Sequence, residues 1–278
     1  MERSKDKFKV GLIQMTSSHV MDDNIRVADE LIRQAASQGA EFILTPEMTT
    51  LLDFESKQVL KKITIERDTS WRHFSSLAKE LGVWLLIGSI AINVGKKATN
   101  KSFLFSPEGK KIATYDKIHM FDVNLPGEDA YKESSVYVAG TEAVVASLPW
   151  GKVGLSICYD LRFPYLYRAL SHAGAVMLTV PAAFTEQTGT AHWHTLLRAR
   201  AIENGAFVFA PAQCGKHTNG RRTYGHSLIV DPWGKIIGDG GNEIGVTVTE
   251  VNMEQVVRAR NSIGSLTHDK NIVIQTVS

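Results

Sequence analysis

The chain has 278 residues, of which 44% are hydrophobic and 22% are charged, and its formal net charge is +2. This balance is typical of a soluble globular protein and gives no reason to expect nucleic acid or an anionic membrane as a partner. The longest apolar run, residues 83–92, is shorter than the roughly 20 residues that a membrane-spanning helix needs. Residues 1–7 lack the apolar stretch of a signal peptide, and the chain has only 2 cysteines. The sequence therefore predicts a soluble cytoplasmic protein without a disulfide framework.

A helix–turn–strand pattern recurs along the chain. An amphipathic segment at 27–37 precedes the apolar strand 42–45, and the segment 71–81 precedes the strand 83–87 in the same way. In the second half the pattern returns as helices 166–172 and 192–204 with strands 176–180 and 207–210. A glycine just past each helix is typical of a left-handed C-terminal cap. Alternation of helices and strands that are apolar on both sides favours an α/β fold with covered sheets.

Two further segments, 102–112 and 227–237, predict β-hairpins because each places Pro and Gly at a turn between β-rich flanks. No Ser/Gly/Pro-rich linker or low-complexity stretch divides the chain. We therefore expect a single domain over residues 1–278. The helix–turn–strand unit occurs twice in each half, which suggests internal pseudo-symmetry.

Cys158 stands between a predicted strand and a predicted helix. The apolar run 152–157 leads into it, and a helix is expected to begin near Pro164. A helix N-terminus lowers the pKa of a nearby thiol, so this position suits a nucleophile facing a cleft. The alternative is a buried structural cysteine, a common fate of this residue type. Cys214 also follows a strand but lacks the turn into a helix, so we expect it to be a bystander near the pocket.

Two charged residues stand at similar positions. Glu47 follows the strand 42–45, where a carboxylate is costly unless it is paired or used. Lys117 follows a strand that begins at Lys111, and an ammonium there could stabilise an oxyanion. Taken singly, each is equally well an ordinary loop or surface charge. Together with Cys158 they supply a base, a cation and a nucleophile, which is enough to hydrolyse a carbon–nitrogen bond.

The sequence resembles the nitrilase superfamily of carbon–nitrogen hydrolases over nearly its whole length. Segments 45–47, 116–119 and 158–164 follow the order and approximate spacing of the family's Glu-Lys-Cys triad. Glu133 matches the family's second glutamate better than the nearby Glu128 does. The resemblance implies an α/β fold, a four-layer α-β-β-α sandwich with two facing mixed sheets and helices outside.

The resemblance also implies a mechanism. Glu47 would remove the proton from Cys158, and the thiolate would attack the carbonyl carbon of an amide. Lys117 and the backbone N–H of Tyr159 would hold the oxyanion, while Glu133 would orient Lys117 or assist proton transfer. Ammonia or an amine would leave, and water activated by Glu47 would hydrolyse the thioester. No metal or organic cofactor is implied.

The residues after Cys158 indicate a branch of the family. Members that cleave nitriles usually carry Trp-Glu there, whereas Tyr159-Asp160 is similar to the amidase branches. The chain resembles the Nit subgroup of ω-amidases and deaminated glutathione amidases at 181–184, 188–193, 197–203, 212–215, 224–227 and 230–234. The implied substrate is a small acidic 2-oxo amide, and the last three segments favour deaminated glutathione. The segment 265–269 is similar to bacterial rather than animal members.

Such a substrate carries a carboxylate, and the best fixed cation for it is an arginine, whose fork pairs both oxygens. Arg162, four residues past the nucleophile, is the candidate, with Phe184 and Thr188 as walls of the pocket. The alternative role for Arg162 is structural, as a clamp on the loop after Cys158.

Several functions remain open within this resemblance. One is an ω-amidase on 2-oxoglutaramate, and another is a hydrolase of N-carbamoyl amino acids or aliphatic amides. A non-enzymatic alternative is a metabolite-binding scaffold, which the combination of base and thiol disfavours. The resemblance further implies a homodimer or a larger even homo-oligomer, with a small-molecule amide as the ligand.

Histidine pairs raise the question of a metal. His192 and His194 form one pair and His217 and His226 another, but no clear Cys/His ligand set accompanies them. We therefore predict no metal site, and we expect His192 and Trp193 to cap or pack the start of a helix.

Overall fold

Two six-stranded sheets form the centre of the computed structural model, which describes residues 6–52, 56–65, 70–125, 131–218 and 220–277. Glu128 lies outside these residues. The first sheet contains β1 (Lys7–Gln14), β2 (Phe42–Leu44), β3 (Trp84–Asn93), β4 (Ala98–Phe105), β5 (Lys111–Asp116) and β16 (Gly245–Asn252). The second contains β8 (Val144–Leu148), β9 (Gly151–Leu155), β10 (Ala175–Thr179), β11 (Phe207–Ala210), β14 (Leu228–Val230) and β15 (Ile236–Asp239).

The two sheets repeat one topology. The strand order is β16-β1-β2-β3-β4-β5 in the first sheet and β8-β9-β10-β11-β14-β15 in the second. In each sheet the second, third and fourth strands are parallel, the first and fifth strands run antiparallel to them, and the sixth strand runs antiparallel to the fifth. The predicted hairpins correspond to the antiparallel pairs β4–β5 and β14–β15. The internal pseudo-symmetry suggested by the helix–turn–strand units is therefore present in the fold.

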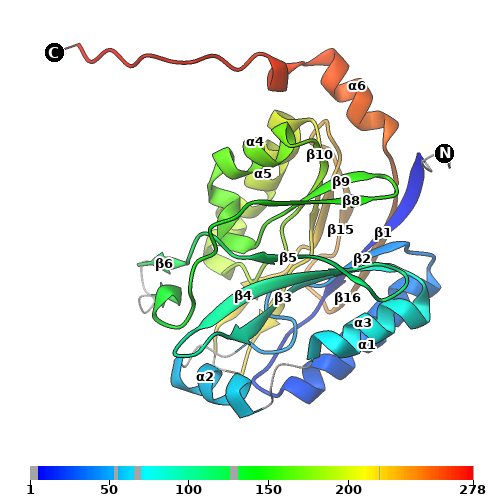
Figure 1. The fold of residues 1–278 in the computed structure, drawn as a ribbon, viewed down its shortest axis with the longest axis vertical. Coiled ribbons are helices and arrows are strands. Elements are labelled where there is room, and N and C mark those ends of the chain that lie inside the picture. The colour runs from blue at the N-terminus through cyan, green and yellow to red at the C-terminus, as the bar shows by residue number, and fades with distance from the viewer. Residues whose placement is uncertain (1–5, 53–55, 66–69, 126–130, 219, 278) are drawn as a thin grey trace.

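Helices cover the outer face of each sheet. α1 (Met21–Ser37) and α3 (Ser70–Leu81) lie against the first sheet, and α4 (Pro164–His172) and α5 (Glu186–Asn204) lie against the second (Figure 1). The helices α2 (Ser56–Ile65) and α6 (Glu254–Ser262) lie outside these layers (Figure 1). The predicted four-layer α-β-β-α sandwich is thus confirmed. Within the described ranges, no helix combines the length and apolar character needed to cross a bilayer.

Side-chain alternation in β2 explains why its sequence is apolar throughout. Phe42 and Leu44 belong to the core between the two sheets, while Ile43 points into the core beneath α1 and α3. Successive side chains of a strand face opposite sides of the sheet, so a strand covered on both sides is apolar at every position. Phe42 meets Phe209 of β11 edge-to-face across the sheets, with ring centroids 6.2 Å apart.

The start of α5 differs from the prediction. The helix begins at Glu186 rather than near His192, so the expectation that His192 and Trp193 cap its start is wrong. Thr185 is the N-cap, and its hydroxyl accepts the backbone N–H of Thr188 at 3.3 Å. His192 and Trp193 lie inside the helix instead, and Trp193 packs there as a fully buried side chain.

Candidate active site

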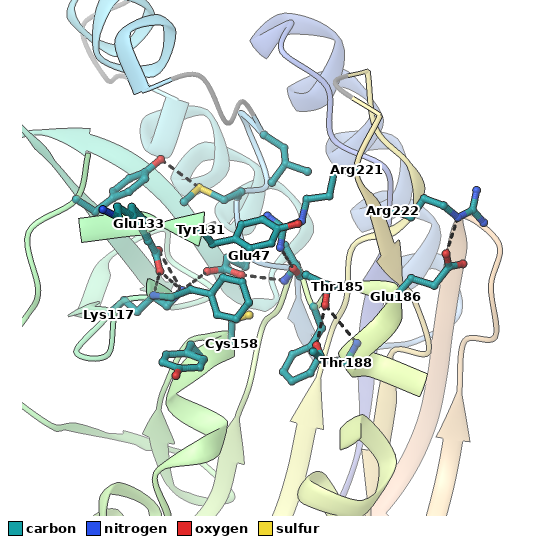
Figure 2. A pocket seen from close by; sticks show the side chains of 18 of the residues that line it. Glu47, Lys117, Tyr131, Glu133, Cys158, Thr185, Glu186, Thr188, Arg221 and Arg222 are labelled. Atoms are coloured by element: carbon teal, nitrogen blue, oxygen red, sulfur yellow. Dashed lines mark hydrogen bonds and ion pairs between the residues drawn. The ribbon is translucent and has the colours of Figure 1, made fainter. Parts of the chain in front are cut away.

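Three loops at strand ends carry the predicted triad. Glu47 follows β2, Lys117 directly follows β5, and Cys158 begins the short 3₁₀ helix η2 (Cys158–Arg162) after β9. Figure 2 shows the three side chains converging on one cavity. Cys158 has φ +48° and Met48, next to Glu47, has φ +55°, both in the left-handed region that non-glycine residues rarely adopt. Such strained backbone is concentrated at functional sites because the surrounding structure must hold it.

Two carboxylates hold the Lys117 ammonium. Its Nζ donates to Glu47 Oε1 at 2.9 Å and to Glu133 Oε2 at 2.8 Å (Figure 2). Glu133 opens the 3₁₀ helix η1 (Glu133–Ser135), just after the small hairpin of β6 (Asp122–Val123) and β7 (Tyr131–Lys132). Burial would lower the pKa of Lys117, but attraction to Glu133, Glu47 and Cys158 outweighs it and raises that pKa well above its usual value. The lysine is therefore a fixed, permanent cation.

Glu47 and Cys158 are neighbours in a buried part of the site, with only 4% and 7% of their surface exposed. Burial would raise the pKa of Glu47, but attraction to Lys117 and hydrogen bonds from Lys117, Cys158 and the Ala183 N–H lower it overall. Burial and the neighbouring Glu47 charge together raise the pKa of Cys158 well above its usual value, although Lys117 opposes them. The resting site thus contains a neutral thiol hydrogen-bonded to an ionised carboxylate, the arrangement that general-base catalysis requires.

Asn100 of β4 is a site residue that the sequence analysis missed. Its side-chain amide donates to Glu47 Oε1 at 2.9 Å and to Glu133 Oε1 at 3.2 Å. The amide thus holds the two carboxylates on either side of Lys117. Nothing in the sequence distinguishes Asn100 from the other polar residues of its strand. It reaches Glu47 only through the pairing of the strands.

Asp160 connects the loop of Cys158 to the strand that carries Lys117. This fully buried carboxylate accepts the hydroxyl of Tyr115 in β5 at 2.7 Å and the backbone N–H of His119 at 3.0 Å. It also accepts the backbone N–H of Ile157 at 2.8 Å. The aspartate of the Cys-Tyr-Asp motif therefore ties the loop of Cys158 to the end of β5, next to Lys117.

The cavity in front of Cys158 has a volume of about 1040 Å³. Its lining includes all four predicted catalytic residues, together with Tyr159, Phe184 and Thr188. Arg162 is not part of the lining. Its guanidinium lies 5.3 Å from the Phe184 ring centre and 3.3 Å from His192 Nδ1, behind the cavity wall.

Two other arginines line the cavity in place of Arg162. Arg221 and Arg222 lie at the start of β13 (Arg222–Tyr224), which pairs with β12 (Cys214–Lys216). Arg221 donates to the Ala183 carbonyl at 3.1 Å and lies 4.8 Å from the centre of the Tyr131 ring (Figure 2). Arg222 pairs with Glu186 at 2.7 Å, nearer the surface. In the sequence both are ordinary loop arginines, and only the fold brings them to the pocket.

The remaining residues of interest lie apart from the reacting groups. Cys214 is buried beside Thr16, its Sγ 3.6 Å from the hydroxyl, and burial raises the pKa of its thiol. His217 is buried between the Ser17 carbonyl and the Thr223 hydroxyl, each at 2.8 Å. Neither Cys214 nor His217 is part of the cavity lining.

Comparison with known proteins identifies the family. The profile of the carbon-nitrogen hydrolase family matches residues 9–261. A deaminated glutathione amidase of Synechocystis sp. is 42% identical over 261 residues, covering 92% of this chain and 96% of that protein. The crystal structure of the C. elegans NitFhit protein matches with a TM-score of 0.90 at 32% identity, covering 95% of this chain but only 65% of that one.

A second structure supports the same assignment. Saccharomyces cerevisiae Nit3, a member of branch 10 of the nitrilase superfamily, matches with a TM-score of 0.82 at 29% identity, covering 92% of this chain and 94% of that one. The predicted resemblance is confirmed over most of the chain. The chain belongs to the carbon-nitrogen hydrolase family and is an amidase-type hydrolase of carbon–nitrogen bonds other than peptide bonds.

Proposed function

We propose that this protein hydrolyses deaminated glutathione, in which 2-oxoglutarate is joined to cysteinylglycine through an amide. The observation that carries the proposal is a large cavity with Cys158, Glu47 and Lys117 on one side and Arg221 on its wall. The sequence relatives include proteins named deaminated glutathione amidase, at 42% identity in Synechocystis and 36% in human.

The proposed chemistry follows from where the protons lie. Glu47 takes the thiol proton of Cys158 as the sulfur attacks the amide carbonyl, and the Lys117 ammonium with the Tyr159 N–H stabilises the oxyanion. Glu47 returns the proton to the leaving cysteinylglycine amine, and a thioester to 2-oxoglutarate remains. Water then loses a proton to Glu47 and attacks the thioester, which releases 2-oxoglutarate and restores the thiol. Glu133 keeps Lys117 in position throughout.

The size and charge of the cavity favour this substrate over a smaller amide. Pockets for drug-sized ligands measure about 300–1,000 Å³, so a cavity of about 1040 Å³ has room for a peptide-extended amide. Arg221 and Arg222 supply cations for the terminal carboxylates of such a substrate, whereas a simple aliphatic amide has no use for them. Arg221 takes over the carboxylate-binding role that the sequence suggested for Arg162.

Release of 2-oxoglutarate tests the proposal, because deaminated glutathione and 2-oxoglutaramate both yield it. We expect the highest kcat/KM on deaminated glutathione, lower values on 2-oxoglutaramate, and no ammonia from an N-carbamoyl amino acid or a nitrile. Cys158→Ala should abolish turnover, and Cys214→Ala, the other buried cysteine, should retain it. Preferred turnover of 2-oxoglutaramate or of a carbamoyl compound would overturn the substrate assignment.

Arginine variants test the carboxylate site separately. Arg221→Ala should raise KM for deaminated glutathione by about 10–100-fold, because a hydrogen bond to a charged group is worth about 1.5–3 kcal/mol. Arg162→Ala is the matched control and should leave KM nearly unchanged. The reverse result would return the role to Arg162.

We further propose that residues 1–278 form one domain, act in the cytoplasm and assemble as a homodimer or a larger even homo-oligomer. The continuous family match over 9–261 supports the single domain. The dimer is supported by large apolar side chains exposed on and beside α4, α5 and α6, namely Tyr165, Ile202, Trp233 and Ile263, each at least half exposed.

A further inference from the structure

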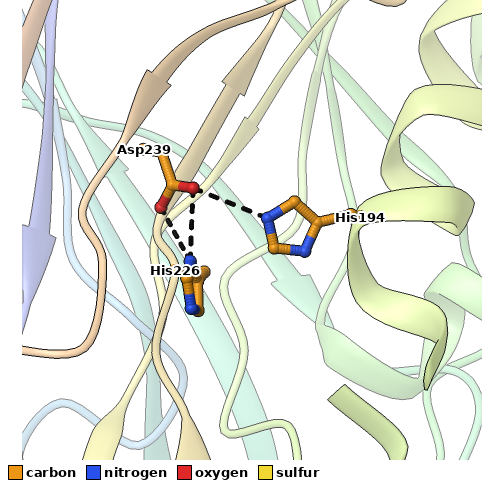
Figure 3. A group of neighbouring side chains, drawn as sticks. All are labelled: His194, His226 and Asp239. Carbon is orange, nitrogen blue, oxygen red and sulfur yellow. Dashed lines mark hydrogen bonds and ion pairs between the residues drawn. The ribbon is translucent and has the colours of Figure 1, made fainter. Parts of the chain in front are cut away.

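Three side chains with metal-binding atoms lie close together near the β15 edge of the second sheet, beside α5. His194 comes from α5, His226 from the loop between β13 and β14, and Asp239 from the end of β15 (Figure 3). One nitrogen of each imidazole and one carboxylate oxygen all lie within 4.8 Å of one another. The side chains are 21–36% exposed, so an ion in solution has access to them.

The separations between the two imidazoles and the carboxylate are already close to those of a metal complex. His226 Nδ1 lies 3.2 Å and His194 Nε2 lies 3.5 Å from the same carboxylate oxygen, Asp239 Oδ2. In a tetrahedral site with bonds of about 2.0–2.1 Å, ligand atoms are about 3.3 Å apart. Small side-chain rotations would therefore bring all three atoms onto one ion.

The surroundings hold the three groups in this orientation. His226 has a left-handed backbone (φ +52°), fixed by its N–H to the Gly241 carbonyl at 2.7 Å and by the Trp193 Nε1 donor at 2.8 Å. The Gly241 N–H also binds Asp239 Oδ1 at 2.9 Å. Tyr224 stacks on His226 and its hydroxyl lies 3.5 Å from His194 Nδ1, so His194 turns Nε2 toward Asp239. Outer contacts of this kind position the ligands in metal proteins.

We propose that His194, His226 and Asp239 bind a divalent transition-metal ion of the zinc type. Two imidazoles and a carboxylate match the ligand preferences of Zn²⁺, whereas Mg²⁺ and Ca²⁺ prefer oxygen ligands alone. A fourth position is left for water. The sequence predicts no metal site, because the pairs His192/His194 and His217/His226 lack a clear Cys/His ligand set, and only the fold brings Asp239 to His194 and His226.

The expected role of the ion is structural. None of its three ligands is part of the cavity lining, but their elements continue into it: Thr188 lies in the first turn of α5, and Arg222 begins β13. A metal at this position would join α5, the loop after β13 and β15 behind the wall of the cavity. We therefore expect it to raise stability and to leave the chemistry at Cys158 unchanged.

Isothermal titration calorimetry of the full chain with ZnCl₂ tests the site. The Cys158→Ala background, freed of metal with a chelator, removes the active-site thiol as a competing ligand. We expect one Zn²⁺ per chain with a micromolar Kd, weakened at least 10-fold by His194→Ala and by Asp239→Asn. His172→Ala is the matched control, because His172 forms an exposed pair with Asp269 at 2.7 Å, away from the proposed site. This variant should bind Zn²⁺ with unchanged affinity.

A thermal melt provides the second readout. Saturating Zn²⁺ should raise Tm by several degrees in the Cys158→Ala chain and in its His172→Ala derivative, but not in the His194→Ala or Asp239→Asn derivatives. Circular dichroism before the titration confirms that each variant is folded. Equal Zn²⁺ affinity in all variants, or no binding at 100 μM ZnCl₂, would overturn the proposal and leave a hydrogen-bonded His–Asp–His group.

Discussion

In the proposed mechanism, the position of one proton between Cys158 and Glu47 governs the reactivity of the site. The pKa of the thiol is raised by burial and by the Glu47 charge, while that of Glu47 is lowered because Lys117 outweighs the cost of burial. In many cysteine enzymes a nearby cation creates a stable thiolate. Here Lys117 lowers the pKa of Glu47 instead, so in the proposed mechanism the thiolate forms only during attack on the substrate.

Absorbance at 240 nm, which detects thiolate, tests this assignment. From pH 5 to 9 we expect no step that depends on Cys158. In the wild type the Cys158 thiol should ionise only above this range. In Glu47→Gln its ionisation should move to lower pH, because the charge that raises the pKa of the thiol is removed while Lys117 remains. Turnover should nevertheless fall by about 10²–10⁴-fold, since the general base is lost. A thiolate step below pH 8 in the wild type, absent in Cys158→Ala, would contradict a neutral resting thiol.

The buried side chain of His217 makes the stability of the fold depend on pH. Burial lowers its pKa to about 4, the Ser17 carbonyl opposes this and the Arg221 charge adds to it. An unfolded histidine binds a proton below about pH 6.5, whereas the folded one stays neutral until about pH 4. Stability from this residue is therefore present at pH 7 and is lost as the pH falls from about 6.5 to 4.

Urea unfolding of the wild type and His217→Gln at pH 7.0 and 4.5 measures this effect. The wild type should lose about 2–3 kcal/mol more than the variant on acidification, since each pKa unit corresponds to about 1.4 kcal/mol. Equal losses in the two proteins would show that the histidine does not contribute to acid sensitivity.

At the scale of elements, a close approach between β3 and the loop of Glu47 positions the base. Gly88 of β3 leaves no room for a side chain, because a Cβ there would lie 2.1 Å from the Thr45 carbonyl oxygen and 2.5 Å from that of Pro46. The Gly88 N–H also donates to the Thr45 hydroxyl at 3.0 Å. A glycine is needed here because the Glu47 loop approaches the β3 backbone closely, not because the backbone conformation requires one.

Gly88→Ala should therefore displace the Glu47 loop. We expect a loss of at least about 2 kcal/mol in the free energy of unfolding and a fall in kcat of more than 10-fold. The matched control is Gly245→Ala in β16, where a Cβ would meet no atom within 4 Å. Urea unfolding and steady-state kinetics give both numbers, and equal behaviour of the two variants would contradict the role of this contact.

Sequence patterns predicted the strands better than the helix starts, because α1 begins at Met21 rather than at 27 and α5 begins at Glu186 rather than at 192. The strand at 207–210 and both hairpins were foreseeable because apolar runs and Pro-Gly turns are local signals. The start of α5 was hidden by Gly189, a poor helix former. A Cβ at Gly189 would lie 2.3 Å from Tyr224, so contact with a distant strand explains the glycine. Local propensity carries no such information.

The site residues divide in the same way into those marked by local sequence signals and those placed by long-range contacts. Glu47, Lys117 and Cys158 stand next to their strands in the sequence, and the family pattern gives their spacing. Arg221 and Asn100 reach the site through strand pairing and loop packing over long sequence separations, which one sequence does not reveal.

At the scale of the whole molecule, the repeated topology leaves one helical layer with exposed apolar side chains. Ile202 of α5 is 50% exposed and Trp233, in the turn before β15, is 61% exposed. Gly234, the residue after Trp233, lies against Ile202, because a Cβ at Gly234 would be 2.6 Å from the Ile202 side chain. Such a surface suits burial against a second copy.

Ile202→Glu should convert the proposed dimer into monomers in sedimentation velocity at micromolar concentration, because a charge would be buried without a partner. Val94→Glu is the control, since Val94 is 52% exposed in the β3–β4 turn on the other sheet. A wild type that sediments as the 30.7 kDa monomer would contradict the assembly.

The central claim is that Cys158 carries the acyl group, and mass spectrometry of enzyme quenched in acid during turnover of deaminated glutathione tests it most directly. We predict a 2-oxoglutaryl thioester on the peptide that contains Cys158, with no acylation of Cys214. The adduct should be absent in Cys158→Ala. Turnover that persists in Cys158→Ala, or an acyl group found on Cys214 instead, would contradict the account.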